Sequence, residues 1–337
     1  MRVLAVETSC DDTAVALVED GRSRCEKVHS QSIHTLHGGV VPELASRGHA
    51  ELLPRLVEMV LQECGISSID QIDAMAATAG PGLIGSLLVG LSWTKAAAWA
   101  SGIRFLAINH LSAHLHIHYG TEKDVDFPAV ALLVSGGHTC IFRMDSWECA
   151  LLLGATRDDA AGEAFDKTAK VTGLGFPGGA ELDRVAEMGD ADKVSLPSPM
   201  ADPSLPEFSF SGLKTAAKLA WEKGARLEDL AASFRSTVVD LLVSKLMFQC
   251  ERTGAKTVLA AGGVSANSLL RTELKLACEE RGCRLLLPSV KHATDNALMV
   301  ARAAEAVLRR RGDASSPISC DAFARWTGDR LYPLCCQ

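Results

Sequence analysis

The sequence lacks the marks of several common protein classes. It has eleven cysteines, yet none are spaced as Cys-x-x-Cys and no zinc-finger spacing occurs. In a chain of 337 residues, this pattern fits reduced thiols in a cytosol better than a disulfide framework. A disulfide-rich secreted scaffold and a zinc ribbon are therefore both disfavoured.

Long uncharged apolar runs are also missing. The most apolar region, residues 83–103, is interrupted by Lys95 and by glycines, so we expect a buried helix there and not a membrane span. The first residues show no signal- or transit-peptide pattern, and we expect a cytoplasmic protein without membrane association. The net charge of −7 argues against broad binding to polyanions, although a local basic patch stays possible.

Several catalytic motifs are absent as well. There is no Walker A loop and no G-x-S-x-G nucleophile elbow. The pair His110 and His114 is not part of an H-E-x-x-H motif, because Leu111 occupies the position of the general-base glutamate. This weighs against metalloprotease chemistry. Cys10 has no obvious local base, which disfavours a covalent cysteine mechanism.

What is present is a repeated order of elements. In each half, two apolar, β-favouring runs flank a polar turn. Each half then ends with the same order of elements: strand, glycine turn, helix, strand, polar loop and helix. This predicts an α/β protein of two similar lobes, residues 1–125 and 126–337, with ligands bound in a cleft at the strand-end turns. Residues 151–246 have no counterpart in the first half and are expected to be a mostly helical insertion.

Four of the ten histidines lie between Ile108 and Gly120. His110 and His114 are four residues apart and would share one helix face. Under the repeat, Asp295 falls at the matching position of the second half. Two imidazoles and a carboxylate make an open metal site that suits Fe²⁺ or Zn²⁺. An ordinary surface histidine pair is the competing interpretation, and His116 and His118 are expected at the surface or behind the ligands.

Glycine-rich turns follow the strand-like runs in both halves. "VSGGHT", "AGPGLIGS" and "AGGVSAN" would let backbone N–H groups approach phosphate oxygens, and "ETSCDD" is a similar small-residue turn. Singly they are ordinary turns, but together they favour a nucleotide cleft. Asp183 is a candidate ligand of a ribose, and Asn267 of an adenine edge or hydroxyl. Turn formation and helix capping are the alternatives for these polar residues.

These stretches closely resemble the TsaD family of tRNA adenosine threonylcarbamoyltransferases, once described as O-sialoglycoprotein endopeptidases. The resemblance runs from Glu7 to about Met299 and is closest to the bacterial type. Its motifs are "ETSCDDTAVAL", "GGVVPELASRGH", "AGPGLIGSLLVG", "NHLSAH", "LLVSGGHT", "DDAAGEAFDK", "GFPGG", "FSFSGLK", "AGGVSAN" and "TDNALM".

The resemblance implies a two-lobed actin-like ATPase (ASKHA) fold and transfer of threonylcarbamoyl from threonylcarbamoyl-AMP to the N6 amine of the adenosine at tRNA position 37. A separate synthase would supply the adenylate, and a TsaB-like paralogue, bound through the N-terminal lobe, and a TsaE-like P-loop ATPase would be partners. His110, His114 and Asp295 match the family's metal ligands. The substrate-binding positions match Val134, Ser135, Gly136, Gly137, His138, Asp166, Gly179, Asp183 and Asn267.

For the chemistry, we expect a divalent metal, Fe²⁺ before Zn²⁺, to polarise the acyl donor, and backbone amides of Ser135, Gly136 and Gly137 to stabilise developing charge. Asp11 is the candidate to orient the amine or accept its proton. Ala180 and the pair His292-Ala293 depart from the family pattern. A small-molecule kinase of the same fold and a nucleotide-dependent scaffold remain alternatives. The chain after Arg311 lies outside the resemblance.

Overall fold

The computed structural model describes residues 1–121 and 125–335. The chain divides into two compact units. The first comprises Met1–Lys123, Trp147–Ala150 and Asp295–Gln337, and the second comprises Asp124–Ser146 and Leu151–Thr294. The predicted boundary near residue 125 lies close to one of these divisions. Asp295–Gln337, however, belongs to the first unit and not to the second.

The first unit contains a five-stranded sheet in the order β3-β2-β1-β4-β5. The first three strands pair antiparallel, whereas β4 and β5 run parallel to β1. Their bounds are β1 (Arg2–Glu7), β2 (Asp12–Glu19), β3 (Arg22–Ser30), β4 (Ala74–Gly80) and β5 (Arg104–Asn109).

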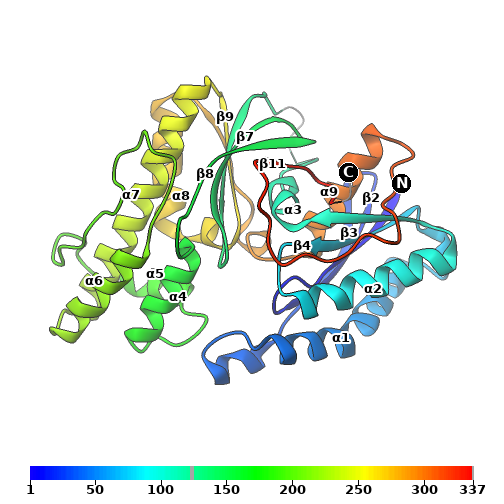
Figure 1. Cartoon of the computed structure of the whole chain (residues 1–337), viewed down its shortest axis with the longest axis horizontal. Helices are drawn as coiled ribbons and strands as arrows, with labels where there is room; N and C mark the ends of the chain where they lie inside the picture. The colour runs from blue at the N-terminus through cyan, green and yellow to red at the C-terminus, as the bar shows by residue number, and fades with distance from the viewer. Residues whose placement is uncertain (122–124, 336–337) are drawn as a thin grey trace. The chain divides into compact units, whose positions relative to one another are not determined.

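Helices cover both faces of this sheet, which explains why β1 and β4 are apolar along nearly their whole length. Successive residues of β1 alternate between two cores, with Leu4 and Val6 in one, Val3 and Ala5 in the other. The first core includes α1 (Pro42–Glu63) and α2 (Ile84–Ser101), and the second includes α3 (His110–His116) and α9 (Ala297–Arg310) (Figure 1).

The second sheet has the same connectivity. Its strands β10-β9-β6-β7-β8 repeat the order of the first sheet, with β6 antiparallel to β7 and parallel to β9. The predicted duplication is therefore confirmed at the level of topology. The bounds are β6 (Ala129–Val134), β7 (Thr139–Ser146), β8 (Cys149–Ala155), β9 (Thr257–Ala261) and β10 (Arg284–Leu286).

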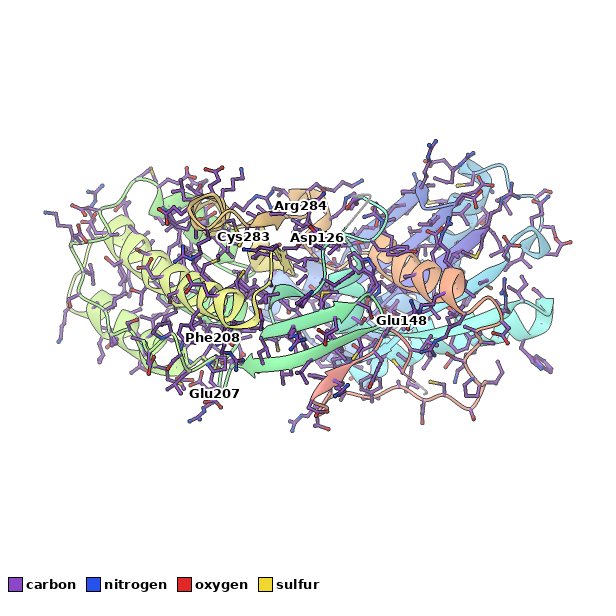
Figure 2. The ribbon with its side chains drawn as sticks, turned by 90° about the horizontal axis from the view of Figure 1, so that it is seen from above. Asp126, Glu148, Glu207, Phe208, Cys283 and Arg284 are labelled. Carbon is purple, nitrogen blue, oxygen red and sulfur yellow. The ribbon has the colours of Figure 1, made fainter. Side chains whose placement is uncertain are left out.

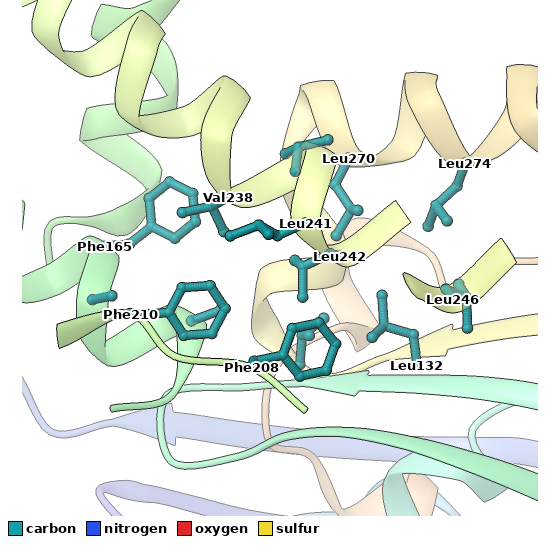
Figure 3. Packing of buried hydrophobic residues seen from close by; sticks show 14 of the residues in the cluster. Leu132, Phe165, Phe208, Phe210, Val238, Leu241, Leu242, Leu246, Leu270 and Leu274 are labelled. Atoms are coloured by element: carbon teal, nitrogen blue, oxygen red, sulfur yellow. The ribbon is translucent and has the colours of Figure 1, made fainter. Parts of the chain in front are cut away.

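Between β8 and β9 the chain is mostly helical, as expected. It forms α4 (Ala161–Val171), α5 (Gly179–Ala186), α6 (Ser211–Glu222) and α7 (Leu227–Thr253), and α8 (Ser268–Glu280) follows β9. Phe208 and Phe210 stack at a centroid distance of 6.1 Å and pack with leucines of α7 against Leu132 of β6 (Figure 3). Glu207, beside Phe208, forms an ion pair with Arg157 (Figure 2).

The chain after α9 lies along the edge of the first sheet. Leu334 forms a bridge with Ile108 of β5, and the amide of Ser316 donates to the carbonyl of Phe105 at 2.7 Å. This segment supplies hydrogen-bond partners for a strand edge that would otherwise be open. It explains why the C-terminal residues join the first unit, although the sequence repeat assigns them to the second half.

Short elements complete the chain. They are the 3₁₀ turns η1 (Ser32–His37), η2 (Ile69–Gln71), η3 (Gly263–Ala266) and η4 (Val290–His292), and β11 (Arg330–Leu331). Helix α1 begins at Pro42, because a proline suits the first helical position. Among the described residues, no helix is both long and apolar enough to cross a bilayer.

The cysteines follow the expectation of reduced thiols with one exception. Nine of them are free in the part of the chain that the structure describes, and several of these lie in the apolar cores. Cys320 is disulfide-bonded, so the expectation is wrong for that residue.

Candidate functional site

Three side chains of the first unit converge on one point. His110 and His114 lie one turn apart on α3, and their ring centroids are 4.7 Å apart. Asp295 directly precedes α9, whose N-cap is Asn296. Its Oδ1 lies 3.2 Å from Nε2 of His114 and 3.7 Å from Nε2 of His110. The predicted trio is therefore brought together, with one ligand atom from each residue within 4.8 Å of the others.

These residues fit a divalent metal ion. Ligand atoms bonded to one ion at about 2.0–2.2 Å are roughly 3–4 Å from each other, as the Nε2 and Oδ1 atoms are here. Nε2 of His114 is buried, and among the described residues it makes no well-aligned hydrogen bond, although Oδ1 of Asp295 lies 3.2 Å away. A buried nitrogen without a partner is costly unless something else satisfies it. Three protein ligands leave positions open for a substrate.

Glu7, which the sequence reasoning missed, supports this centre. It ends β1 and is fully buried, and its Oε2 lies 3.2 Å from Nδ1 of His110. Oε2 also accepts a hydrogen bond from Thr78 at 2.5 Å, and Oε1 accepts from the amide of Ser9 at 2.5 Å. A carboxylate that accepts the Nδ1 proton leaves the Nε2 lone pair free for a metal. The sequence feature that could have indicated Glu7 is its position as an acidic residue at the end of an apolar, strand-like run.

The centre carries excess negative charge. Burial lowers the pKa of His110, but Asp295 and Glu7 outweigh it and raise the pKa to about 9. Burial raises the pKa of Glu7, yet the neighbouring His110 brings it below its usual value. The pKa of Asp12 rises to about 7, mainly through burial and also through Asp295 and Asp11. Crowded carboxylates of this kind favour a bound cation.

Asp11 and Cys10 occupy the turn between β1 and β2, in the same acidic group. Burial raises the pKa of the Cys10 thiol far above its usual value, and Asp11 and Asp295 add to the shift. The thiol therefore stays protonated, in agreement with the argument against a covalent cysteine. Asp11 is half-buried, and its main-chain oxygen accepts from the amide of Gln31 at 3.3 Å.

The second unit holds the predicted turn at Ser135–His138. The amide of Ser135 donates to the carbonyl of His138 at 2.8 Å, and Oγ of Ser135 accepts from the amide of His138 at 3.2 Å. Gly136 and Gly137 are exposed, with open space where a Cβ would be. Val134 lies wholly in the core, so its side chain is not available to a ligand.

A second turn packs against the first. Gly262 has φ +90°, and a Cβ there would lie 2.3 Å from the carbonyl oxygen of Val134. Only glycine permits this approach. The turn ends at Asn267, whose Oδ1 caps α8 by accepting from the amide of Leu270 at 3.0 Å. The capping alternative for Asn267 therefore holds.

Asp166 organises the start of α5, and Asp183 organises the start of α8. Oδ1 of Asp166 accepts from the amides of Gly178 and Gly179, each at 2.9 Å. Asp183 joins α5 to the start of α8, since it accepts from the amide of Ser268 at 2.9 Å and pairs with Arg235 at 2.9 Å. In this structure both aspartates therefore fix backbone turns.

The other two histidines are not at the surface. His116 is 1% and His118 is 3% exposed. Burial lowers the pKa of His116 to about 4. Its Nδ1 donates to the carbonyl of Ser112 at 2.7 Å, and its ring lies 5.4 Å from that of Trp147. Of the two positions expected for these histidines, the surface is therefore excluded, and every residue of α3, which includes His116, is buried.

Known structures share this fold. HypF of T. kodakarensis matches with a TM-score of 0.64 and 14% identity over 92% of this chain and 48% of its own. The activator of 2-hydroxyisocaproyl-CoA dehydratase from Clostridium difficile matches with a TM-score of 0.53 and 14% identity over 94% and 99%. Together with the repeated sheet topology, these matches confirm the predicted actin-like ATPase (ASKHA) fold.

Sequence relatives identify the family. A protein of Caldicellulosiruptor bescii named tRNA N6-adenosine threonylcarbamoyltransferase is 46% identical over 89% of this chain and 91% of its own length. One of the same name from Geobacter metallireducens is 43% identical over 98% of each chain. The model of the TsaD family, tRNA N6-adenosine threonylcarbamoyltransferase, matches residues 23–302. The chain therefore belongs to the TsaD family.

Proposed function

We propose that the protein transfers a threonylcarbamoyl group from threonylcarbamoyl-AMP to the N6 amine of the adenosine at position 37, beside the anticodon, in tRNAs that read codons beginning with A. Membership of the TsaD family over nearly the whole chain carries this proposal. In the reaction, the amine nitrogen forms a bond to the carbamoyl carbon. The bond from that carbon to the phosphate oxygen breaks, AMP leaves, and the amine loses one proton.

The proposed metal ligands are His110, His114 and Asp295, and the proposed ion is Fe²⁺, with Zn²⁺ as the alternative. When bound, the ion supplies a Lewis acid for an oxygen of the acyl donor. Glu7 holds His110 with Nε2 toward Asp295. Asp11 is proposed to orient the amine or accept its proton, since AMP is already a good leaving group and no protein nucleophile is required.

The turns of the second unit are proposed to hold the adenylate. The exposed main chain at Gly136 and Gly137 leaves space for a phosphate, and amides there would stabilise negative charge. Asp166 fixes the backbone at Gly179, Asn267 caps α8, and Asp183 of α5 accepts from the first amide of α8. His138 closes the Ser135 turn.

The proposed setting is the bacterial cytoplasm, as for the family that the sequence resembles. A separate synthase would supply the adenylate, and the partners would be a TsaB-like paralogue and a TsaE-like P-loop ATPase. These partners follow from the resemblance and determine how the activity should be assayed.

The test is modification of tRNA by the purified protein. The chain would be incubated with both partners, threonylcarbamoyl-AMP and unmodified tRNA, and the digested nucleosides would be analysed by mass spectrometry. Formation of threonylcarbamoyladenosine supports the proposal. If intact protein and partners form none, the kinase and scaffold alternatives return, and ATP turnover without tRNA would favour the kinase.

A further inference from the structure

The segment after α9, which lies outside the motifs of the family resemblance, forms most of a pocket that Asn109 completes. The pocket has a volume of about 300 Å³ and lies wholly in the first unit. This size is at the lower end of small-ligand sites, which span roughly 300–1,000 Å³. Its lining combines arginines, aromatic rings and one amide, mainly Asn109, Phe323, Arg325, Trp326, Arg330 and Tyr332.

The main chain is fixed on both sides of this pocket. On one side, the amide of Phe323 donates to the carbonyl of Ala79 at 3.0 Å, and Gly80 packs so closely that a Cβ there would lie 2.2 Å from the carbonyl oxygen of Phe323. On the other side, the amide of Asn109 donates to the carbonyl of Pro333 at 2.8 Å. Residues 325–332, which include the two-residue strand β11, therefore form a segment held at the ends of β4 and β5.

Among the described residues, the side chains of the two arginines in this segment have no polar partner. Within residues 1–121 and 125–335, the side chains of Arg325 and Arg330 make neither a hydrogen bond nor an ion pair. Both are exposed. Asp329, the one acid between residues 325 and 332, is not among the lining residues. In a chain of net charge −7, two unpaired guanidinium groups beside a pocket are available to an anion.

The aromatic rings and the amide define the rest of the ligand. Trp326 is half-buried in the wall, and Tyr332 is 38% exposed. A ring in such a wall can stack on a nucleobase, and arginines beside it can bind the adjoining phosphate. Asn109 accepts at Oδ1 from the amides of Leu111 and Ser112, which leaves its NH₂ group as the possible donor to a base or phosphate.

We propose that this pocket binds one unpaired nucleotide of the tRNA anticodon loop, with its base on Trp326 and its phosphate on Arg325 and Arg330. The position supports a nucleotide close to the acceptor adenosine, because Asn109 directly precedes the proposed ligand His110. This inference rests on the proposed function for the identity of the RNA. A free mononucleotide offers the same chemistry and is the competing occupant.

The test uses the full chain and an unmodified, fluorescently labelled anticodon stem-loop RNA. Titrations at several salt concentrations would compare the wild type with Trp326→Ala, Trp326→Phe and the pair Arg325→Gln/Arg330→Gln. Base stacking on an aromatic ring predicts roughly tenfold weaker binding for Trp326→Ala and recovery in Trp326→Phe. Loss of the contacts to this one phosphate predicts that the slope of log affinity against log salt falls by about 0.7.

Matched controls separate the pocket from net charge. Arg22→Gln/Arg55→Gln removes the same charge from exposed positions elsewhere in the first unit and should keep the wild-type slope. Circular dichroism would confirm that each variant is folded. AMP binding and metal content should be unchanged in all of them. Equal slope losses in both arginine pairs would overturn the proposal, as would unchanged RNA binding in folded pocket variants.

The outcome distinguishes this inference from the proposed function. If the wild type modifies tRNA and the pocket variants bind and modify it equally well, the pocket inference alone fails. If the pocket variants lose AMP binding and keep RNA binding, the occupant is a free nucleotide and the inference is again wrong. If the wild type binds the RNA through this pocket but transfers no threonylcarbamoyl group, the proposed function is wrong and the inference of RNA binding at the pocket is still supported.

Discussion

Replacing Glu7 by Gln should weaken the metal centre without removing any ligand. The Glu7 carboxylate accepts three hydrogen bonds or close polar contacts, from Ser9 N, Thr78 Oγ1 and His110 Nδ1. Glutamine offers one acceptor oxygen and one NH₂ group of nearly the same shape. In this fully buried position, either one donor must therefore lose its acceptor or His110 must change its tautomer.

Either orientation of the glutamine has a cost. If its oxygen replaces Oε2, the Ser9 amide loses its acceptor, and a buried donor left unpaired costs about 1–3 kcal/mol of stability. If its NH₂ group replaces Oε2, Nδ1 of His110 must accept, so the proton moves to Nε2 and that nitrogen cannot bind a metal. Removing such a supporting group typically lowers metal affinity by about 10- to 100-fold.

The assay is metal affinity by competition with a chelator, together with the free energy of unfolding in urea for the metal-free protein. Glu19→Gln is the matched control, since it makes the same chemical change on β2, where Glu19 is part-exposed and pairs with Arg2. Wild-type metal affinity and stability in Glu7→Gln would refute the supporting role of Glu7.

Three further predictions concern other parts of the chain. Gly262→Ala should lower the free energy of unfolding in urea by about 2–5 kcal/mol, because strain at φ +90° adds to the clash with Val134. The control Gly137→Ala should leave the free energy of unfolding within about 0.5 kcal/mol of the wild-type value. Burial lowers the pKa of His49, so its neutral form contributes stability that is complete above about pH 6.5 and lost as the pH falls. Unfolding free energies at pH 7.5 and 5.5 should therefore differ less for His49→Asn than for the wild type, and equal differences would contradict this. Asp183→Ala should weaken AMP binding by loosening the start of α8, with metal content unchanged; unchanged AMP affinity would remove Asp183 from the site.

The repeated architecture was predictable because it depends on local chemistry. Apolar runs ended by glycine turns, such as the one at Gly262, mark strands that enter helices, and both halves show this order. Less could be predicted from the sequence about which helix packs against which sheet. The helix after Asp295 is the last helix of the second half in the sequence. Its apolar face nevertheless packs on the first sheet, among residues such as Val3 and Ala5.

The three proposed metal ligands were predicted from their spacing and from the repeat. The residues around them could be identified only from the folded structure. No sequence pattern joins Glu7 to His110, because the contact spans 103 positions of the chain. His116 was expected at the surface or behind the ligands, and the sequence could not exclude the surface, where polar residues usually lie. In the fold, α3 is buried against α9 and the first sheet. The pocket beside Trp326 is lined mainly by residues after Arg311, for which the family motifs give no information.

The most direct test of the account is to measure bound metal and tRNA modification in the same preparations of wild type, Asp295→Ala and His110→Ala. We predict one divalent metal per chain in the wild type, and joint loss of metal and threonylcarbamoyladenosine formation in folded preparations of both variants. Full modification by a metal-free variant would contradict the role of the metal centre.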